Sequence, residues 1–458
     1  MFNPSFFRGL SALIGTLATA GAALAQPFVV TGGGVSSTPL YQQEITQFAA
    51  ASFLEYVGIS TDPAKTGWLA NTPAAFGRAG AVHGIVVETP LTQTQINDYL
   101  RTGPGRIGGL GGHGPLIQMP AAGVPVTISY KGPAGPVTLS KQQLCWVMSG
   151  AVDKWSLLGV NPGTAPDRFT VIYHADRSGV TEVLTRYLQA VCGPDSLVAF
   201  SGKSLFVQEF PSNTPANNFI GANGSDGVVT AMNTYPSAIT YLGADPAFIG
   251  AFKQAALVNH NNGSTYTATL ENSVPALGST VSLPTATGSV ERSPDGADWL
   301  NTNNQANPFN WVRSMVNPPS GYPIVAFSTF VVSQCYTDPA VANAVKAFLA
   351  QHYSARNSAA DWGHVVVRPI VTAQRAQEMI TYINNNPGTL LARQFQGLLM
   401  AGYDPNASPT DRGLLDLHGQ APLSPVNRAR LLQAFVYGTA AKLEIGNPTV
   451  CGDYPGRG

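Results

Sequence analysis

Between residues 28 and 191 the chain repeats one pattern four times: a β-branched or Gly-rich run, a short polar turn and an amphipathic stretch. The predicted strands are 28–30, 81–87, 126–130 and 169–173. The predicted helices that follow them are about 39–53, 92–100, a helix beginning at Ser140, and 180–191. Strands that alternate with helices indicate an α/β fold with largely parallel sheets. Further on, the pattern predicts a strand at 323–327, a helix at about 339–352, and two or three helices between 370 and 440.

The N-terminus has the features of a cleavable export signal. Arg8 precedes an apolar run from Leu10 to Ala25, and the small-x-small ending 23–25 predicts cleavage before Gln26. A membrane helix needs about 18 or more apolar residues in a row, and no later stretch approaches that length. We therefore expect residues 1–25 to be removed and the mature protein to be periplasmic or secreted.

Length and charge narrow the class of protein further. About 430 residues remain after the signal, which is more than one hydrophobic core usually organises, so two lobes are expected. Charged residues make up 11% of the chain, and 25 Lys+Arg balance 25 Asp+Glu. Without a basic stripe or a polybasic segment, neither nucleic acid nor an anionic membrane is an expected partner.

Motifs for cofactor or metal chemistry are weak. Residues 109–114 fit the dinucleotide pattern G-x-G-x-x-G, but a strand-like run at 116–119 follows where a helix should begin. The seven histidines lack zinc-site spacing, and the chain has no Cys-x-x-Cys pair and no G-x-S-x-G hydrolase motif. We therefore expect no metal, no cofactor and no enzyme.

Four cysteines in an oxidising compartment predict two disulfides. They are Cys145, Cys192, Cys335 and Cys451. Their spacing leaves all three pairings open.

Two predicted helix starts are candidate anion sites, at 36–38 and at Ser178-Gly179. The first N–H groups of a helix have no intrahelical partner, and the helix dipole places partial positive charge there. Each start taken singly is equally an ordinary helix cap. The two helix starts could form one anion site only if the fold brings them together.

Several motifs, in one order along the chain, resemble the DING proteins, relatives of the phosphate-binding component of phosphate ABC transporters. They lie at 32–36, 56–61, 116–120, 224–228, 320–324, 333–336 and 443–451. The resemblance covers about 27–365 and 425–455, and the segment 375–422 looks like an insertion. The resemblance also implies the disulfides Cys145–Cys192 and Cys335–Cys451.

The fold implied by this resemblance is a two-lobed periplasmic-binding-protein-like fold of type II, with a ligand cleft between the α/β lobes. Residues 26–115 would form the first part of lobe 1, and residues 116–319 would form lobe 2. Residues 320–458, with the helical insertion, would complete lobe 1.

The resemblance also implies a phosphate site, in which this chain departs from the family pattern at several positions. The implied ligand-binding residues are Ser36, Ser37, Thr61, Glu88, His174, Ser178 and Gly179, with Arg177 as an additional candidate. Glu88 stands where the family has an Asp that accepts the phosphate proton, and its side chain is one methylene longer. In the family motif Arg-x-x-Ser-Ser-Gly-Thr-Thr, His174 replaces the binding Arg and Val180 replaces the binding Thr. Arg177 would either supply the missing charge or lie on the surface beside Asp176.

These departures predict phosphate binding that is weakened or made pH-dependent. Arginine holds oxyanions through a fixed, always charged fork, whereas a histidine changes its charge between pH 5 and 8. The expected partners are inorganic phosphate and a membrane ABC transporter complex, and the expected state is a monomer. A second hypothesis is a diverged secreted surface or interaction protein that has lost phosphate binding, with 375–422 as its partner site. A third is a weak phosphomonoesterase.

Overall fold

The computed structural model describes thirteen stretches of the chain. These are 29–34, 37–47, 54–105, 112–194, 196–269, 272–273, 275–276, 316–352, 365–366, 385, 445–446, 451–452 and 454–458. The export signal expected at 1–25 and Ser36 lie outside the described residues. So do the insertion expected at 375–422 and the helices expected between 370 and 440, apart from residue 385.

The strands of the described residues form one long sheet and one small sheet. The long sheet has the order β2-β1-β3-β12-β4-β8-β6-β7, with β13 and β9 paired to β4, and the small sheet has the order β11-β10-β5. The bounds are β1 Val29–Gly33, β2 Leu54–Gly58, β3 Gly84–Val87, β4 Leu116–Lys131, β5 Thr138–Leu139, β6 Thr170–His174, β7 Phe219–Ala222, β8 Ala238–Gly243, β9 Lys253–Gln254, β10 Ala256–Val258, β11 Thr265–Tyr266, β12 Val325–Ser333 and β13 Val365–Val366.

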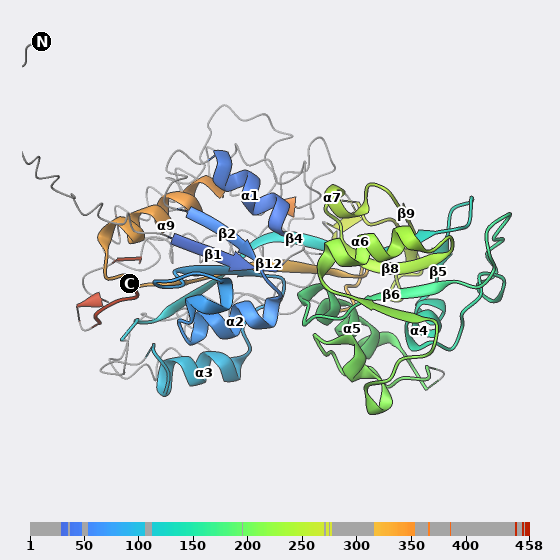
Figure 1. Cartoon of the computed structure of the whole chain (residues 1–458), viewed down its shortest axis with the longest axis horizontal. Helices are drawn as coiled ribbons and strands as arrows, with labels where there is room; N and C mark the ends of the chain where they lie inside the picture. The colour runs from blue at the N-terminus through green and yellow to red at the C-terminus, as the bar shows by residue number, and fades with distance from the viewer. Residues whose placement is uncertain are drawn as a thin grey trace, which may run out of the picture.

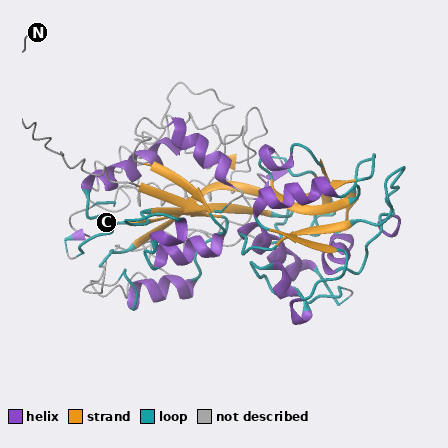
Figure 2. Ribbon diagram, viewed as in Figure 1, coloured by secondary structure: helices purple, strands orange, loops and turns teal. Residues whose placement is uncertain are grey.

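The helices lie on both sides of the strands in each half of the molecule (Figure 2). Their bounds are α1 Thr38–Gln47, α2 Thr61–Leu69, α3 Gln93–Arg101, α4 Lys141–Ser149, α5 Gly179–Val191, α6 Gly224–Thr234, α7 Pro246–Ile249 and α9 Pro339–His352. Short 3-10 turns lie at Pro73–Phe76, Ser156–Leu158, Phe206–Glu209 and Pro211–Asn213. Among the described residues, no helix combines the length and the apolarity needed to cross a membrane.

Strand β4 connects the two halves of the long sheet. Its residues 116–125 pair antiparallel with β12, and its residues 126–131 pair antiparallel with β8. We call the sheet half with β2, β1, β3 and β12 the first lobe, and the half with β8, β6 and β7 the second lobe (Figure 1). The lobe boundaries expected from the resemblance remain proposals. We propose that the chain passes from the first lobe to the second within β4.

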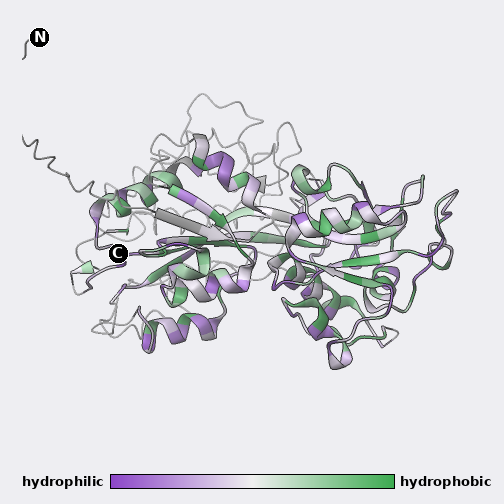
Figure 3. Ribbon diagram, viewed as in Figure 1, coloured by the Kyte–Doolittle hydropathy of each residue, from purple (hydrophilic) through white to green (hydrophobic). Residues whose placement is uncertain are grey.

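The long sheet is mixed, so the expectation of largely parallel sheets is wrong. Strand β1 pairs parallel with β2 and β3, and β6 pairs parallel with β7 and β8, as strand–helix alternation predicts. In contrast, β12 pairs antiparallel with both β3 and β4. The difference arises because β12 comes from late in the chain and enters between two early strands. Every residue of β12 is buried, and the middle of the sheet is correspondingly hydrophobic (Figure 3).

Local signals placed several helices well. Helix α4 begins directly after Ser140, whose hydroxyl accepts from the backbone N–H of Gln143 at 3.2 Å. The Gln143 side chain in turn accepts from the backbone N–H of Ser140 at 2.8 Å, which completes the predicted capping box. Helix α9 has the predicted bounds, 339–352. Helix α1 was predicted over 39–53, and its described part ends at Gln47.

Both disulfides implied by the resemblance are present. Cys145 in α4 is bonded to Cys192, which directly follows α5, with a Cα–Cα distance of 5.7 Å. Cys335, which follows β12, is bonded to Cys451 with a Cα–Cα distance of 5.4 Å. The first disulfide connects two helices of the second lobe, and the second attaches the end of the chain to the first lobe.

The last residues of the chain are fixed by a buried arginine. The guanidinium of Arg457 lies 4.1 Å from the ring centroid of Trp68, within the range of a cation–π contact. Its Nη1 donates to the backbone carbonyls of Trp68 at 3.0 Å and of Val82 at 2.8 Å. The Trp68 carbonyl also accepts from the backbone N–H of Asn71 at 3.1 Å, so the contact that Arg457 makes with the buried Val82 carbonyl is the more important of the two.

Replacing Arg457 with Met should lower the free energy of unfolding by about 1–3 kcal/mol, because the buried Val82 carbonyl then loses the hydrogen bond from Arg457. Urea unfolding followed by circular dichroism measures this loss. Arg168 provides the control: its side chain is 71% exposed and pairs with Asp153 at 2.9 Å. Arg168→Met should cost less than about 1 kcal/mol, as exposed ion pairs do. Equal losses in both variants would contradict a fixing role for Arg457.

Candidate functional site

The predicted site residues lie at the carboxyl ends of parallel strands, where ligands of open α/β sheets usually bind. In the first lobe, Gly34 follows β1, Thr61 begins α2 after β2, and Glu88 follows β3. In the second lobe, His174 ends β6 and Gly179 begins α5. The contacts described below bring these two edges together.

The carboxylate of Glu88 lies at the centre of this arrangement. Glu88 is 2% exposed. Its Oε2 accepts a hydrogen bond from the hydroxyl of Thr61, at the start of α2. Its Oε1 lies 3.5 Å from the hydroxyl of Ser37, directly before α1, at the outer limit of a hydrogen bond. One carboxylate therefore engages hydroxyls at the starts of two helices.

Two glycines allow the backbone to approach this carboxylate. A Cβ added to Gly34 would lie 1.6 Å from Glu88 Oε1, so a larger residue cannot stand there while Glu88 keeps its place. A Cβ added to Gly179 would lie 2.6 Å from Thr61 Oγ1 and 2.8 Å from Glu88 Cβ. The start of α5 in the second lobe therefore packs directly against Thr61 and Glu88 of the first lobe.

A second carboxylate, that of Asp176, lies beside the first group. Its Oδ2 accepts from the hydroxyl of Ser60 at 2.5 Å, and its Oδ1 accepts from the backbone N–H of Gly224, the first residue of α6, at 2.7 Å. Burial alone would raise the pKa of Asp176. The interaction with His174 and the hydrogen bonds from Ser60 and Gly224 outweigh burial, and they hold the pKa of Asp176 well below its ordinary value.

Histidine 174 is buried next to Asp176, with 1% of its surface exposed. Its Nδ1 lies 3.5 Å from Asp176 Oδ1, an ion-pair distance that is too long for a strong hydrogen bond. Within the described residues, neither ring nitrogen of His174 has a hydrogen-bond partner. Buried polar atoms are normally hydrogen-bonded, so these nitrogens are the atoms that a bound group would engage.

The remaining predicted residues, Arg177, Ser178 and Ser36, do not share one position. The Arg177 side chain is 47% exposed, and its Nη1 lies 3.7 Å from Asp62 Oδ2. Of the two positions considered for Arg177, the surface one is observed, with Asp62 rather than Asp176 as its partner. Ser178 is the N-cap residue of α5, and its backbone N–H donates to the carbonyl of Ser204 at 3.0 Å. Ser36 lies outside the described residues.

The structure thus brings Ser37, Thr61, Glu88 and Gly179 together and places His174 beside them through Asp176. Sequence reasoning missed Asp176 as a site residue. Its one local signal was its place two residues after His174 in the motif. Its partners in the fold are 116 and 48 residues away in sequence, so no local pattern connects them.

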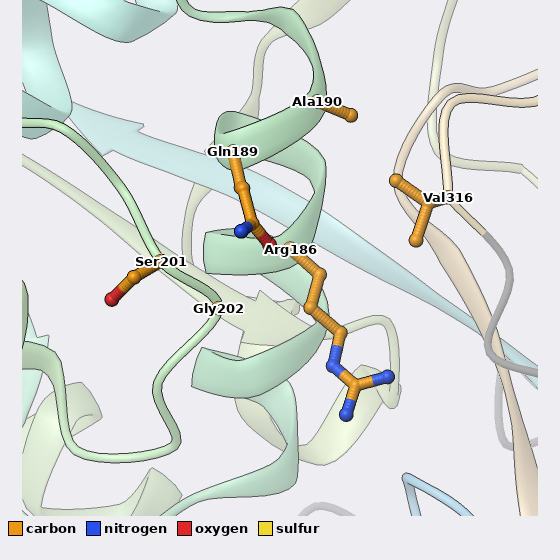
Figure 4. Close-up of a pocket in the computed structure, with 6 residues that line it drawn as sticks. All are labelled: Arg186, Gln189, Ala190, Ser201, Gly202 and Val316. Atoms are coloured by element: carbon orange, nitrogen blue, oxygen red, sulfur yellow. The ribbon is translucent and has the colours of Figure 1, made fainter.

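A pocket of about 380 Å³ lies away from this site, beside α5 in the second lobe (Figure 4). It is lined by Arg186, Gln189, Ala190, Ser201, Gly202 and Val316. None of the residues predicted to bind phosphate lines it. Among the described residues, no group of three or more His, Cys, Asp or Glu side chains is placed to hold a metal ion.

Comparison with known families decides the class of protein. The sequence profile described as the PBP superfamily domain matches residues 75–356, which is more than half of the chain. The chain belongs to the PBP superfamily.

Relatives and solved structures within this superfamily agree with the resemblance found in the sequence. Alkaline phosphatase L of Pseudomonas aeruginosa is 27% identical over 446 residues, covering 96% of this chain and 97% of the relative. A phosphate-binding protein from an unknown prokaryotic organism is 30% identical over 352 residues, covering 72% and 88%. The structure of PfluDING, a periplasmic phosphate-binding protein of Pseudomonas fluorescens with bound phosphate, aligns with a TM-score of 0.58 at 27% identity, covering 72% and 87%. The resemblance to DING proteins and the periplasmic-binding-protein-like fold are confirmed.

The lowered pKa of Asp176 predicts a specific loss of stability in acid. A carboxyl whose pKa is lower in the folded than in the unfolded protein stabilises the fold above about pH 4, and this contribution is lost as the pH falls through the folded pKa. The free energy of unfolding should therefore fall less steeply below pH 4 in Asp176→Asn than in the wild type, as measured by urea unfolding. Asp98→Asn, at an exposed position in α3, should keep the wild-type slope. A wild-type slope in Asp176→Asn would contradict the prediction.

Proposed function

We propose that this protein is an exported receptor that binds inorganic phosphate between its two lobes. The observation that supports this best is the convergence of Ser37, Thr61 and the start of α5 at Gly179 around the carboxylate of Glu88. Hydroxyls and helix starts are the donors that bind oxyanions without fixed charges. Three of the relatives carry names or titles that describe phosphate binding.

Glu88 would select for an anion that carries a proton. The hydroxyls of Ser37 and Thr61, which now face Glu88, would donate to phosphate oxygens, and Glu88 would accept the remaining phosphate proton. Sulfate has no proton to donate near neutral pH, so its charge would oppose that of Glu88 directly. The site should therefore discriminate strongly between these two tetrahedral anions.

His174 would supply the charge that the family motif takes from arginine. Its Nδ1 faces Asp176 at 3.5 Å, so Nε2 is the ring nitrogen that would donate to the anion. Ser178 and the backbone of Gly179 would add donors at the start of α5, and Ser36 would contribute from the first lobe. In this arrangement Arg177 would contact Asp62 rather than phosphate.

The setting of this function follows from the same resemblance. We propose that residues 1–25 are removed on export, that the mature protein is a periplasmic or secreted monomer, and that a membrane ABC transporter complex receives the phosphate. PfluDING is a periplasmic phosphate-binding protein, which supports the periplasmic placement.

Calorimetric titration of the mature chain from Gln26, unfolded and refolded free of ligand, tests the proposal directly. Phosphate should bind at pH 6 and more weakly at pH 8, whereas sulfate should produce little heat at either pH. His174→Arg should tighten phosphate binding about tenfold or more at pH 8, because a charge-assisted hydrogen bond contributes about 1.5–3 kcal/mol.

The same titration on two further variants tests the role of Glu88. Glu88→Gln should weaken phosphate binding at least tenfold and bring the affinities for phosphate and sulfate close together. Glu55→Gln, which removes a carboxylate paired with Arg78 in the same lobe, should bind like the wild type. Absence of phosphate heat from a demonstrably folded wild type at both pH values would refute the proposal and favour a secreted interaction protein.

A second candidate function, phosphomonoester hydrolysis, is favoured by the name of the P. aeruginosa relative, which matches nearly the whole chain. We rank it below binding because no hydrolase nucleophile motif was found in the sequence. We expect no turnover of p-nitrophenyl phosphate above the buffer rate at pH 6–9. Turnover that persists through purification and disappears in Glu88→Gln would establish this activity instead.

A further inference from the structure

A second polar group crosses between the lobes, one helical turn away from the phosphate site. Its members are Lys65 in α2 and Thr89 after β3, from the first lobe, and Glu182 in α5, from the second lobe. Lys65 is 2% exposed and Glu182 is 7% exposed. The mechanism proposed above uses none of these three side chains.

Hydrogen bonds connect the three side chains directly. Lys65 Nζ donates to Thr89 Oγ1 at 2.6 Å, and Thr89 Oγ1 donates to Glu182 Oε2 at 2.7 Å. Lys65 Nζ also lies 3.8 Å from Glu182 Oε2. The other oxygen, Oε1, accepts from Arg186 within α5. Glu182 is therefore held by Arg186 in its own lobe and by Lys65 and Thr89 in the other lobe. We call the three residues Lys65, Thr89 and Glu182 the interlobe bridge.

Each member of the bridge lies next to a residue of the phosphate site. Lys65 is one turn after Thr61 in α2, Thr89 directly follows Glu88, and Glu182 is one turn after Gly179 in α5. Helices α2 and α5 face each other across the two lobes in Figure 1. Separation of the lobes would break the contacts between Glu182 and the first lobe.

Burial makes this bridge a strong constraint on the distance between the lobes. Desolvation lowers the pKa of Lys65, and the attraction of Glu182 opposes that shift. Breaking a buried pair by removing one partner leaves an uncompensated charge, which is far more unfavourable than removing both partners. If Glu182 lost its charge, Lys65 would regain a favourable environment when the lobes separate and water reaches it.

We propose that Lys65, Thr89 and Glu182 are positioning residues that hold the lobes closed and keep the start of α5 against Thr61 and Glu88, thereby setting how long phosphate stays bound. The effect on phosphate rests on the proposed function. The effect on lobe closure does not.

Small-angle X-ray scattering of the ligand-free protein tests closure without any phosphate. Glu182→Gln should increase the radius of gyration relative to the wild type, because buried Lys65 loses its main counter-charge. The double variant Lys65→Met/Glu182→Gln should lie closer to the wild type than Glu182→Gln alone. Glu55→Gln is the matched control, since it removes a carboxylate from an ion pair within the first lobe, and it should leave the radius unchanged.

Phosphate dissociation, followed by stopped-flow fluorescence, provides the second readout. Glu182→Gln should release phosphate at least tenfold faster, whereas its ratio of phosphate to sulfate affinity should stay at the wild-type value, since Glu88 sets that ratio. If Glu182→Gln does not fold, Thr89→Val, which removes one hydroxyl, should show the same changes to a smaller degree.

A wild-type radius of gyration in the folded Glu182→Gln variant would overturn the proposal that the interlobe bridge holds the lobes closed. If only Thr89→Val folds, the same result in that variant would overturn it. If the wild type does not bind phosphate, the proposed function fails, and the scattering comparison still decides whether the bridge holds the lobes closed.

Discussion

The starts of four helices, α1, α2, α5 and α6, bring hydrogen-bond donors and partial positive charge to one place. Two carboxylates compensate them: that of Glu88, which is buried, and that of Asp176, which is partly buried. Glu88 accepts from hydroxyls at the starts of α1 and α2, and the start of α5 packs against it. Asp176 accepts from Ser60 directly before α2 and from Gly224 at the start of α6. Without acceptors, these buried donors would destabilise the closed arrangement. In the ligand-free protein, the carboxylates of Glu88 and Asp176 therefore accept hydrogen bonds from donors of the kind that an oxyanion-binding site needs.

This compensation also explains how the lobes remain in contact. Asp176 comes from the second lobe and Ser60 from the first, so their hydrogen bond joins the lobes, as does the packing of Gly179 against Thr61. Strand β4 supplies one covalent connection between the lobes, since it carries backbone hydrogen bonds in both halves of the sheet.

The sequence predicted what local chemistry determines and failed where distant segments decide. The starts of α4, α5 and α9 were predicted from a capping motif or from apolar spacing, and the structure agrees within one residue. The predicted ends of α5 and α9 agree as well. The mixed sheet was missed because the partners of β12 lie about 200 residues earlier in the chain. Within the candidate site, Thr61 and Glu88 were found through family motifs. Asp176 was missed because its partners belong to other segments, and the partner of Arg177 could be assigned only from the fold.

The disulfide between Cys335 and Cys451 closes a covalent loop of the chain around residues 336–450, and this loop contains the segment 375–422, which we expected from the sequence to be an insertion. A peptide bond cut anywhere inside that loop would leave both fragments joined, so the protein would keep its mass on a non-reducing gel and separate only after reduction. Evolution and protein engineering can therefore change the length of this segment while the chain end, fixed by Arg457 against Trp68, keeps its attachment to the first lobe. The loop is a natural point for inserting a reporter or a recognition domain without opening the chain.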